Sequence, residues 1–415
     1  MKLKQFLIII LVLVIASFIG YKFGKTQIGS FKSVIEPIQE HHSPPSVVIE
    51  PGSAVETASY IIFHDDEGFI YAKNGDTGKI EFSGTDAATV INWALSSLKP
   101  DRIWREKVVV KGNFIIDSPI KIPSWTIFQI IGEITLAPNS NCNMIENEDW
   151  TNGNEEIEIY GGRLYGNRQQ QSSGDGIHFE FHGTNPYDSI DGEEIFIHHL
   201  EVMLAKDDGV HIDMSGSGSR HVWMDTCRVT HAGDRGIFFQ GFDSKFEHIT
   251  VSGIGSQPEE GNIVLYYPSN CHFDNIYCSG GGLHNIYAKR GHHLQFSNIR
   301  LDNPRKEAAL LEGIYDYTFT NIQIRSTINL DADNTYSAIT LRSDLSHHSL
   351  DNNFVGVVYD KDGTNDYKYV IEEVDSNQDY NIFVGVNGRD AETGTLRVLG
   401  ANSEYGTIVG SVITS

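Results

Sequence analysis

Three segments decide the fold: FDNIYC (273–278), FSNIRL (296–301) and FTNIQI (319–324) repeat one pattern at a spacing of 23 residues. Each starts with a phenylalanine, continues with two polar residues, and ends with two apolar residues separated by one position. Looser copies of the pattern start at Ile159, Ile197, Met224 and Phe246. A repeat of this length indicates stacked units, each of which buries its apolar face only against its neighbours.

A second short strand is expected after each copy, because apolar and polar residues alternate there as well. These segments are DGIHFE (175–180), DGVHID (208–213), RGIFFQ (235–240), GNIVLY (261–266), HNIYAK (284–289) and AALLEG (308–313). An apolar period of two residues excludes helical repeats, and two strands per repeat are too few for a propeller blade. The sequence therefore predicts an all-β protein, a right-handed single-stranded parallel β-helix.

Asparagine occupies one position of three successive coils, as Asn275, Asn298 and Asn321. The two equal steps predict an internal asparagine ladder, in which each side-chain amide bonds to the next coil.

The chain before the repeats is predicted to contain a targeting segment and a linker. Residues 1–24 combine Lys2 and Lys4 with an apolar run, which is typical of a signal peptide; an uncleaved anchor formed by residues 5–24 is the other interpretation. Either one places the protein outside the cell or at its surface. Residues 25–57 contain Ser, Pro and mixed charges, and we expect a linker there.

The folded part is expected to start at residue 58. Residues 58–104 are predicted to form an N-terminal strand and a capping helix, because Ala87–Leu98 carries its apolar residues on one helical face. This helix would cover the open end of the solenoid. Residues 105–415 are expected to form the parallel β-helix.

Composition excludes several classes of protein. With 40% hydrophobic residues the 415-residue chain can build a core, so global disorder is excluded. Four cysteines exclude a disulfide scaffold. A formal net charge of −24 argues against a nucleic-acid-binding groove. We expect a polysaccharide partner, no nucleic acid, and membrane contact only through the N-terminal segment.

The second strands predict a charged outer face. Equivalent residues of adjacent coils lie ~4.8 Å apart, and side chains alternate between the core and the outside. The residues expected on one outer face are Asp175, His178, Glu180, Asp207, Asp208, His211, Asp213, Asp234, Arg235, Tyr287 and Lys289. Closely stacked carboxylates repel one another, so at least one of their pKa values should rise.

Three functions fit this face. Asp175, Asp207 and Asp208 would supply the acid and the base of a glycoside hydrolase, with the other polar side chains binding substrate and no cofactor. Alternatively, a polysaccharide lyase or uronate epimerase would bind Ca²⁺, with Glu180 and Asp213 as ligands and Arg235 or Lys289 as the base. The third alternative is a surface protein that binds glycans without catalysis.

A family resemblance supports the hydrolase interpretation. The order of a helix, VVVKGNFII (108–116), PIKIPS (119–124) and β-helix coils resembles the pectate-lyase-like superfamily of right-handed parallel β-helices. SGDGIHF and AKDDGVHI further resemble the polygalacturonase family, which implies catalytic Asp175, Asp207 and Asp208 and inverting hydrolysis of an acidic, pectin-like polysaccharide. The family's next elements differ here, since Arg235 stands where a histidine is expected, and IYAK keeps Lys289 but has Tyr287 in place of an arginine.

Overall fold

The computed structural model describes residues 58–414 apart from several internal segments, and nearly all of its regular secondary structure is β-strand. The internal segments outside the description are 152, 182–193, 216–220, 256–260, 326–330, 332–333, 345–346, 362–365 and 389–390. The predicted targeting segment and linker also lie outside the described residues. No helix among the residues described is long and apolar enough to cross a membrane.

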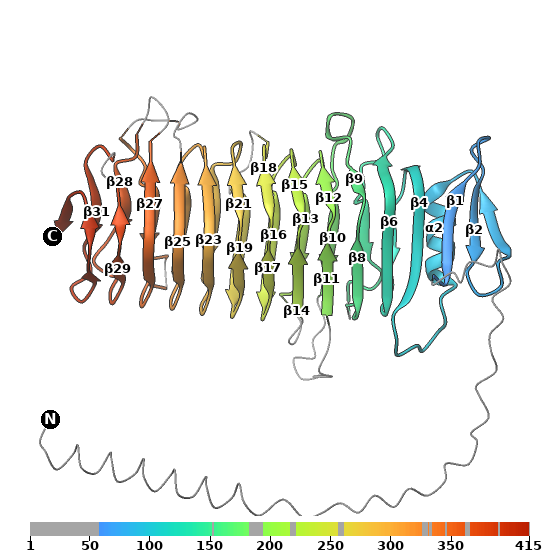
Figure 1. Ribbon diagram of the computed structural model, residues 1–415, viewed down its shortest axis with the longest axis horizontal. Helices are drawn as coiled ribbons and strands as arrows, with labels where there is room; N and C mark the ends of the chain where they lie inside the picture. Colours follow the sequence, from blue (N-terminus) through green and yellow to red (C-terminus); the bar gives the residue numbers. More distant parts are fainter. Residues whose placement is uncertain are drawn as a thin grey trace, which may run out of the picture. The chain divides into compact units, whose positions relative to one another are not determined.

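Two sheets make up the walls of the coils (Figure 1). One sheet, here called the site sheet, contains β5 (Ile120–Ile122), β7 (Ile145–Asn147), β10 (Ile177–Glu180), β13 (Val210–Asp213), β16 (Ile237–Phe242), β19 (Gly261–Ser269), β22 (His284–Lys289), β24 (Ala309–Glu312), β26 (Ile339–Arg342), β28 (Tyr369–Glu373), β31 (Gly394–Val398) and β34 (Val412–Thr414).

The other sheet bends around the rest of each coil and often supplies two strands per coil. It contains β1 (Tyr60–His64), β2 (Ile70–Asn74), β3 (Ile80–Gly84), β4 (Glu106–Ile116), β6 (Thr126–Leu136), β8 (Ile157–Tyr160), β9 (Arg163–Tyr165), β11 (Glu194–His198), β12 (Glu201–Met203), β14 (His221–Asp225), β15 (Arg228–Thr230), β17 (Lys245–Glu247), β18 (Thr250–Ser252), β20 (His272–Asp274), β21 (Tyr277–Ser279), β23 (Gln295–Asp302), β25 (Thr318–Arg325), β27 (Asn353–Asp360), β29 (Ile382–Val384), β30 (Val386–Asn387), β32 (Glu404–Tyr405) and β33 (Ile408–Val409).

The register of the site sheet is the predicted one. Ile177 pairs with Val210, Val210 with Ile237, Ile237 with Ile263, and Ile263 with Ile286, all in parallel strands. Because the side chains of a strand alternate, this register places the residues on either side of each pair in straight rows on the outer face. The predicted parallel β-helix is confirmed.

A stack of phenylalanine rings runs through the core. Neighbouring rings are nearly parallel, with centroids 4.7–5.4 Å apart. The stack consists of Phe246, Phe273, Phe296, Phe319, Phe354 and Phe383, all of them buried. Each ring contacts the equivalent ring of the next coil, so the apolar anchors of the repeat are what joins the coils internally.

The prediction of an internal asparagine ladder is wrong. Asn275, Asn298 and Asn321 are exposed and have φ of +53° to +56°, the left-handed conformation that asparagine tolerates at a turn. Asn321 Nδ2 does donate to Asn298 Oδ1 at 2.8 Å, but Asn298 Nδ2 donates to Asp274. The asparagines therefore shape an outer corner of the coil.

The amphipathic helix lies at the N-terminal end of the coil stack (Figure 1). It is α2 (Ala87–Ser96), and the carboxylate of its N-cap Asp86 accepts the N–H groups of Ala88 and Thr89. Its buried side chains, which include Val90, Ile91 and Leu95, belong to the same core as the coils. A short 3₁₀ turn, η1 (Arg168–Gln170), is the other helical element described.

Candidate functional site

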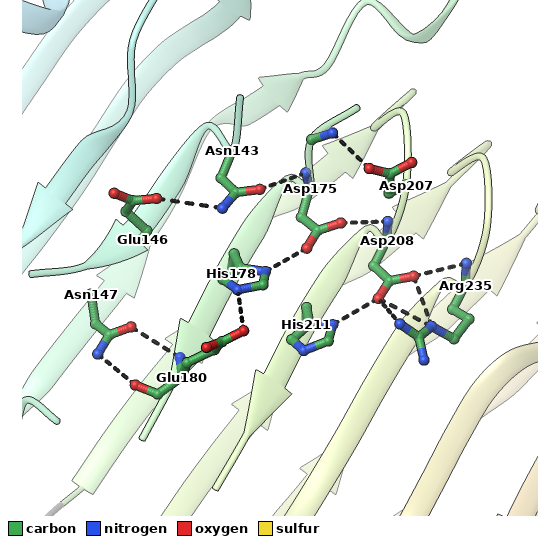
Figure 2. Close-up of polar contacts among 11 residues, drawn as sticks. Asn143, Glu146, Asn147, Asp175, His178, Glu180, Asp207, Asp208, His211 and Arg235 are labelled. Carbon is green, nitrogen blue, oxygen red and sulfur yellow. Dashed lines mark hydrogen bonds and ion pairs between the residues drawn. The ribbon is translucent and has the colours of Figure 1, made fainter. Parts of the chain in front are cut away.

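Two consecutive coils carry the same Asp-Gly-x-His sequence at the start of a site-sheet strand. The glycine is required by space, because a Cβ at Gly176 would lie 2.3 Å from Cγ1 of Val202 and 2.5 Å from the backbone oxygen of Gly209. The aspartate before the glycine and the histidine two positions after it then lie on one side of the strand. The repeated motif thus gives two Asp–His pairs, Asp175–His178 and Asp208–His211, which we call the Asp–His site (Figure 2).

The aspartates also join adjacent coils. Asp175 Oδ1 accepts the N–H of Asp208 at 2.7 Å, and Asp208 Oδ1 accepts the N–H of Arg235 at 3.1 Å. One coil earlier, Asn143 Oδ1 accepts the N–H of Asp175 at 3.0 Å. These contacts form a ladder of side chain to backbone bonds along the row (Figure 2). Asp175 and Asp208 therefore have a structural role whatever their chemistry.

The first pair is closed on both sides. His178 Nδ1 lies 2.6 Å from Asp175 Oδ2, and His178 Nε2 lies 2.9 Å from Glu180 Oε1. Burial alone would lower the pKa of His178, but the hydrogen bonds and charges of Asp175 and Glu180 outweigh it and raise the pKa. His178 is thereby held as an imidazolium more firmly than a free histidine.

The second pair is open on one side. His211 Nδ1 lies 2.9 Å from Asp208 Oδ2, and no described residue forms a hydrogen bond with His211 Nε2. The Arg235 guanidinium donates two hydrogen bonds to the same carboxylate, with Nη2 2.7 Å from Oδ2 and Nε 2.9 Å from Oδ1. The Asp208 side chain is 2% exposed and the His211 side chain 14% exposed. The histidine is therefore the member of this pair that a ligand can reach.

The two aspartates have opposite pKa shifts. Burial raises the pKa of Asp175, helped by the negative charge of Asp208 and opposed by His178. Burial would also raise the pKa of Asp208, but its hydrogen bonds to His211 and Arg235 outweigh this and lower it. The rise predicted for one stacked carboxylate thus occurs at Asp175, while Asp208 stays ionised.

The imidazoles belong to a row of stacked rings. The centroid distances are 5.2 Å from Trp150 to His178, 4.6 Å from His178 to His211, and 4.6 Å from His211 to Phe238. The Arg235 guanidinium lies 4.2 Å from the centroid of the Phe238 ring. Because the histidine faces cover one another, their edges rather than their faces are available to a ligand.

The structure places the other predicted site residues at different distances from these pairs. Asp207 turns away from the histidines, and its Oδ2 accepts the N–H of Gly174 at 2.7 Å, which makes it a corner residue (Figure 2). Asp234 is half-buried at the equivalent corner of the next coil, and its N–H donates to the carbonyl of Asp207. Glu180 and Asp213 pair in register on adjacent coils.

Tyr287 and Lys289 do not join the Asp–His site. Tyr287 lies in the row of His211 but three coils further on, which is roughly 14 Å at the strand spacing. It is buried among Phe238, Val264 and Leu310, because neighbours in the same outer row pack over it. Its hydroxyl donates to Glu312 at 2.5 Å, and burial raises the pKa of that hydroxyl.

Sequence reasoning missed the residues that surround Tyr287 and Lys289. Glu312 and Arg342 continue the row of Lys289 on the next two coils, and Glu307 continues the row of His284. Counting the register past Lys289 would have found all three.

Two sets of side chains offer metal-ligand atoms. Ligand atoms of Asp175, His178 and His211 lie within 4.8 Å of one another, but both nitrogens of His178 already face carboxylates and its raised pKa opposes metal binding. Glu180 and Asp213 supply the oxygen ligands that Ca²⁺ prefers. They fit the predicted calcium site in kind, although two carboxylates make up only part of a coordination shell of six to eight oxygens.

Comparison with known proteins identifies the fold. No protein-family model and no curated protein sequence matches the chain. Among solved structures, the A-module of mannuronan C-5 epimerase AlgE6 from Azotobacter vinelandii aligns with a TM-score of 0.57 and 13% identity, over 80% of this chain and 95% of that one. The enzymatically active domain of tailspike protein 2 from bacteriophage CBA120 aligns with a TM-score of 0.60 and 14% identity, over 79% of this chain and 50% of that one.

A third solved structure is similar in fold but is named as an adhesin and not as an enzyme. PfbA, a surface adhesin of Streptococcus pneumoniae, aligns with a TM-score of 0.51 and 11% identity, over 80% of this chain and 86% of that one. These similarities each extend over about 80% of this chain, and the predicted parallel β-helix fold is confirmed. Identities this low show the fold alone.

Proposed function

We propose that the protein is an extracellular enzyme that modifies a uronate-containing polysaccharide by proton transfer at the Asp–His site. The observation that carries the proposal is the Asp208–His211 pair. Asp208 is buried, holds His211 Nδ1 and stays ionised, while no described residue bonds to Nε2 of the same ring. A carboxylate behind one ring nitrogen orients the imidazole and leaves the other nitrogen to accept a proton.

The reaction that suits this arrangement starts at the carbon next to a uronate carboxylate. His211 Nε2 removes the proton from that carbon, and negative charge develops on the carboxylate. The His178 imidazolium and the Arg235 guanidinium, on the coils before and after His211, add positive charge that would stabilise this developing charge. If the electron pair expels the neighbouring glycosidic oxygen, which takes a proton from water, the reaction is an elimination. If water instead donates a proton to the opposite face of the carbon, and His211 returns its proton to solvent, the reaction is an epimerisation.

The proposed substrate class depends on the positive charges of His178 and Arg235 and on the similar solved structures. One of the similar structures is named for acting on mannuronan, which is a polymer of a uronic acid, and another for an enzymatically active tailspike domain. If the reaction is an elimination, Ca²⁺ bound by Glu180 and Asp213 would add positive charge beside the substrate carboxylate. An extracellular or cell-surface location follows from the polysaccharide substrate and from the predicted signal segment.

The test is turnover of uronate polymers by the purified protein and by His211→Gln. We expect a product with a carbon–carbon double bond that absorbs in the near ultraviolet, or incorporation of solvent deuterium at the epimerised carbon. The His211→Gln variant should lose at least 100-fold in turnover, the lower range for loss of a general base. Its matched control is His248→Gln, because His248 also pairs with an aspartate, Asp225, but on the other sheet.

Equal turnover in both variants would contradict the proposal. Suppression of wild-type turnover by a chelator, with recovery on adding Ca²⁺, would support the calcium site at Glu180 and Asp213. No turnover on any uronate polymer would instead favour the third alternative, a surface protein that binds glycans without catalysis.

Hydrolysis by the aspartates is a second candidate, favoured by the opposite pKa shifts of Asp175 and Asp208. Such a split is the usual sign of an acid and a base in a glycosidase. It requires substrate to reach two carboxylates that are each buried and bonded to a neighbouring histidine. New reducing ends without a double bond would identify hydrolysis.

A further inference from the structure

A polar cavity opens on the site sheet, on the coils that follow the Asp–His site. Its volume is about 470 Å³, and it lies over β19, β22, β24 and β26. The residues that line it and carry the argument are Tyr266, His284, Lys289, Lys306, Glu307 and Arg342. We call it the cationic cavity.

Positive charge exceeds negative charge in the cationic cavity. Glu312 is already matched, since it accepts the Tyr287 hydroxyl, forms an ion pair with Arg342, and lies 4.0 Å from Lys289 Nζ. Lys306 Nζ lies 5.9 Å from the centroid of the Tyr336 ring, and it has no carboxylate within ion-pair distance among the residues described. A surplus of cations is unexpected in a chain with a net charge of −24, and it indicates an anionic ligand.

A buried charged pair lines the cavity. His284 Nδ1 and Glu307 Oε2 lie 3.2 Å apart as an ion pair, and their side chains are 7% and 14% exposed. Burial would raise the pKa of Glu307, but His284 outweighs it and lowers the pKa, so the carboxylate stays charged. Ionisable groups with shifted pKa values that line a cavity are typical of functional sites.

We propose that the cationic cavity binds a carboxylate-bearing sugar unit of the polysaccharide, apart from the unit that reacts at His211. Lys306 and Lys289 would contact the carboxylate of the sugar unit, and the side chains of Tyr266 and Tyr336 would contact its ring. The proposal deepens the proposed function and rests on it for the class of polymer. Tyr287 and His211 belong to the same outer row, three coils apart, so one chain that follows the solenoid axis can reach both sites.

The experiment is equilibrium binding, measured by calorimetry, of oligogalacturonate, oligomannuronate and oligoglucuronate, each against the neutral oligosaccharide of the same length. To prevent turnover, the measurements use His211→Gln. We expect at least one acidic oligosaccharide to bind at least tenfold more tightly than its neutral counterpart. Removal of one charged contact by Lys306→Gln should weaken that binding about tenfold or more. Added salt should weaken it as well.

Lys111→Gln is the matched control, because Lys111 is an exposed lysine of β4 and its loss changes the net charge equally. Lys289→Gln is the second variant, and circular dichroism checks that each protein is folded. The inference is overturned if no acidic oligosaccharide is preferred, or if Lys306→Gln and Lys289→Gln bind as Lys111→Gln does.

The two proposals fail separately. Weaker acidic binding in Lys306→Gln, together with turnover that is unaffected by His211→Gln, would support the cavity and reject the catalytic site. Loss of turnover in His211→Gln with unchanged binding in Lys306→Gln and Lys289→Gln would do the opposite.

Discussion

The Asp–His site and the cationic cavity occupy the same outer rows of the same sheet, yet they use buried carboxylates differently. In the Asp–His site the partner histidine belongs to the same coil as the aspartate, three residues on, as in Asp208 and His211. In the cavity the partners belong to neighbouring coils, as Tyr287 and Glu312 do. Contacts within one coil orient a reactive group, whereas contacts between coils hold the wall of a cavity together.

The arginines sharpen this comparison. One buried carboxylate of each site has an arginine one coil further on, Arg235 for Asp208 and Arg342 for Glu312. Arg235 is 19% exposed and Arg342 44% exposed. Glu312 also has Lys289 and Tyr287 nearby, so it depends less on its arginine than Asp208 does.

The largest expected effect comes from removing the charge of Arg235. Arg235→Met leaves Asp208 buried with only His211 and a backbone N–H as partners, so we expect a loss of about 3 kcal/mol in the free energy of unfolding. Arg342→Met should cost less than about 1 kcal/mol, because its pair is partly screened by solvent and Lys289 remains. Urea denaturation followed by circular dichroism measures both. Equal losses would show that the two carboxylates are neutralised alike.

An intermediate effect is expected from the contact between coils at Tyr287. Tyr287→Phe removes a buried hydrogen bond to Glu312 while keeping the ring, which should cost about 1–2 kcal/mol. Tyr71→Phe is the control, since its hydroxyl donates to the half-buried Asp65 in a bond that is only partly buried, and its loss should matter less. Thermal unfolding measures both variants. A smaller loss for Tyr287→Phe than for Tyr71→Phe would mean that the cavity wall does not depend on this bond.

The rows of both sites follow from the sequence, because alternation and register fix which side chains point outward. DGIHFE and DGVHID align one above the other, and the structure keeps that alignment. Alternation does not apply at corners. It could not show that the Asp207 carboxylate faces Gly174, or that Asn298 lies outside the core, because both residues lie where the chain turns.

The sequence pattern also could not predict which side chains of the outer face are buried. Tyr287 occupies an outward position, but Phe238, Val264 and Leu310 in the same row cover it. A strand pattern gives the direction of each side chain, whereas burial depends on the sizes of its neighbours in adjacent coils. The exposure of His211 beside the buried Asp208 has the same origin.

The smallest expected effect is a dependence on pH at His178. Its pKa in the folded protein is raised above the ordinary 6.5 by Asp175 and Glu180, so the protonated ring stabilises the fold. This stabilisation is complete below pH 6.5 and is lost as the pH rises through the folded-state pKa. The difference in melting temperature between wild type and His178→Gln should therefore be largest in mildly acidic solution and shrink in alkaline solution.

Asp208 supplies the contrast within the same site. Its pKa is lowered, so its contribution is present above 3.8 and disappears only as the pH falls through the folded-state value. The stability difference between wild type and Asp208→Asn should therefore persist at the alkaline pH values where that of His178→Gln has shrunk. If the difference for His178→Gln is the same at every pH, His178 is not held protonated, and the positive charge assigned to it beside His211 must come from Arg235 alone.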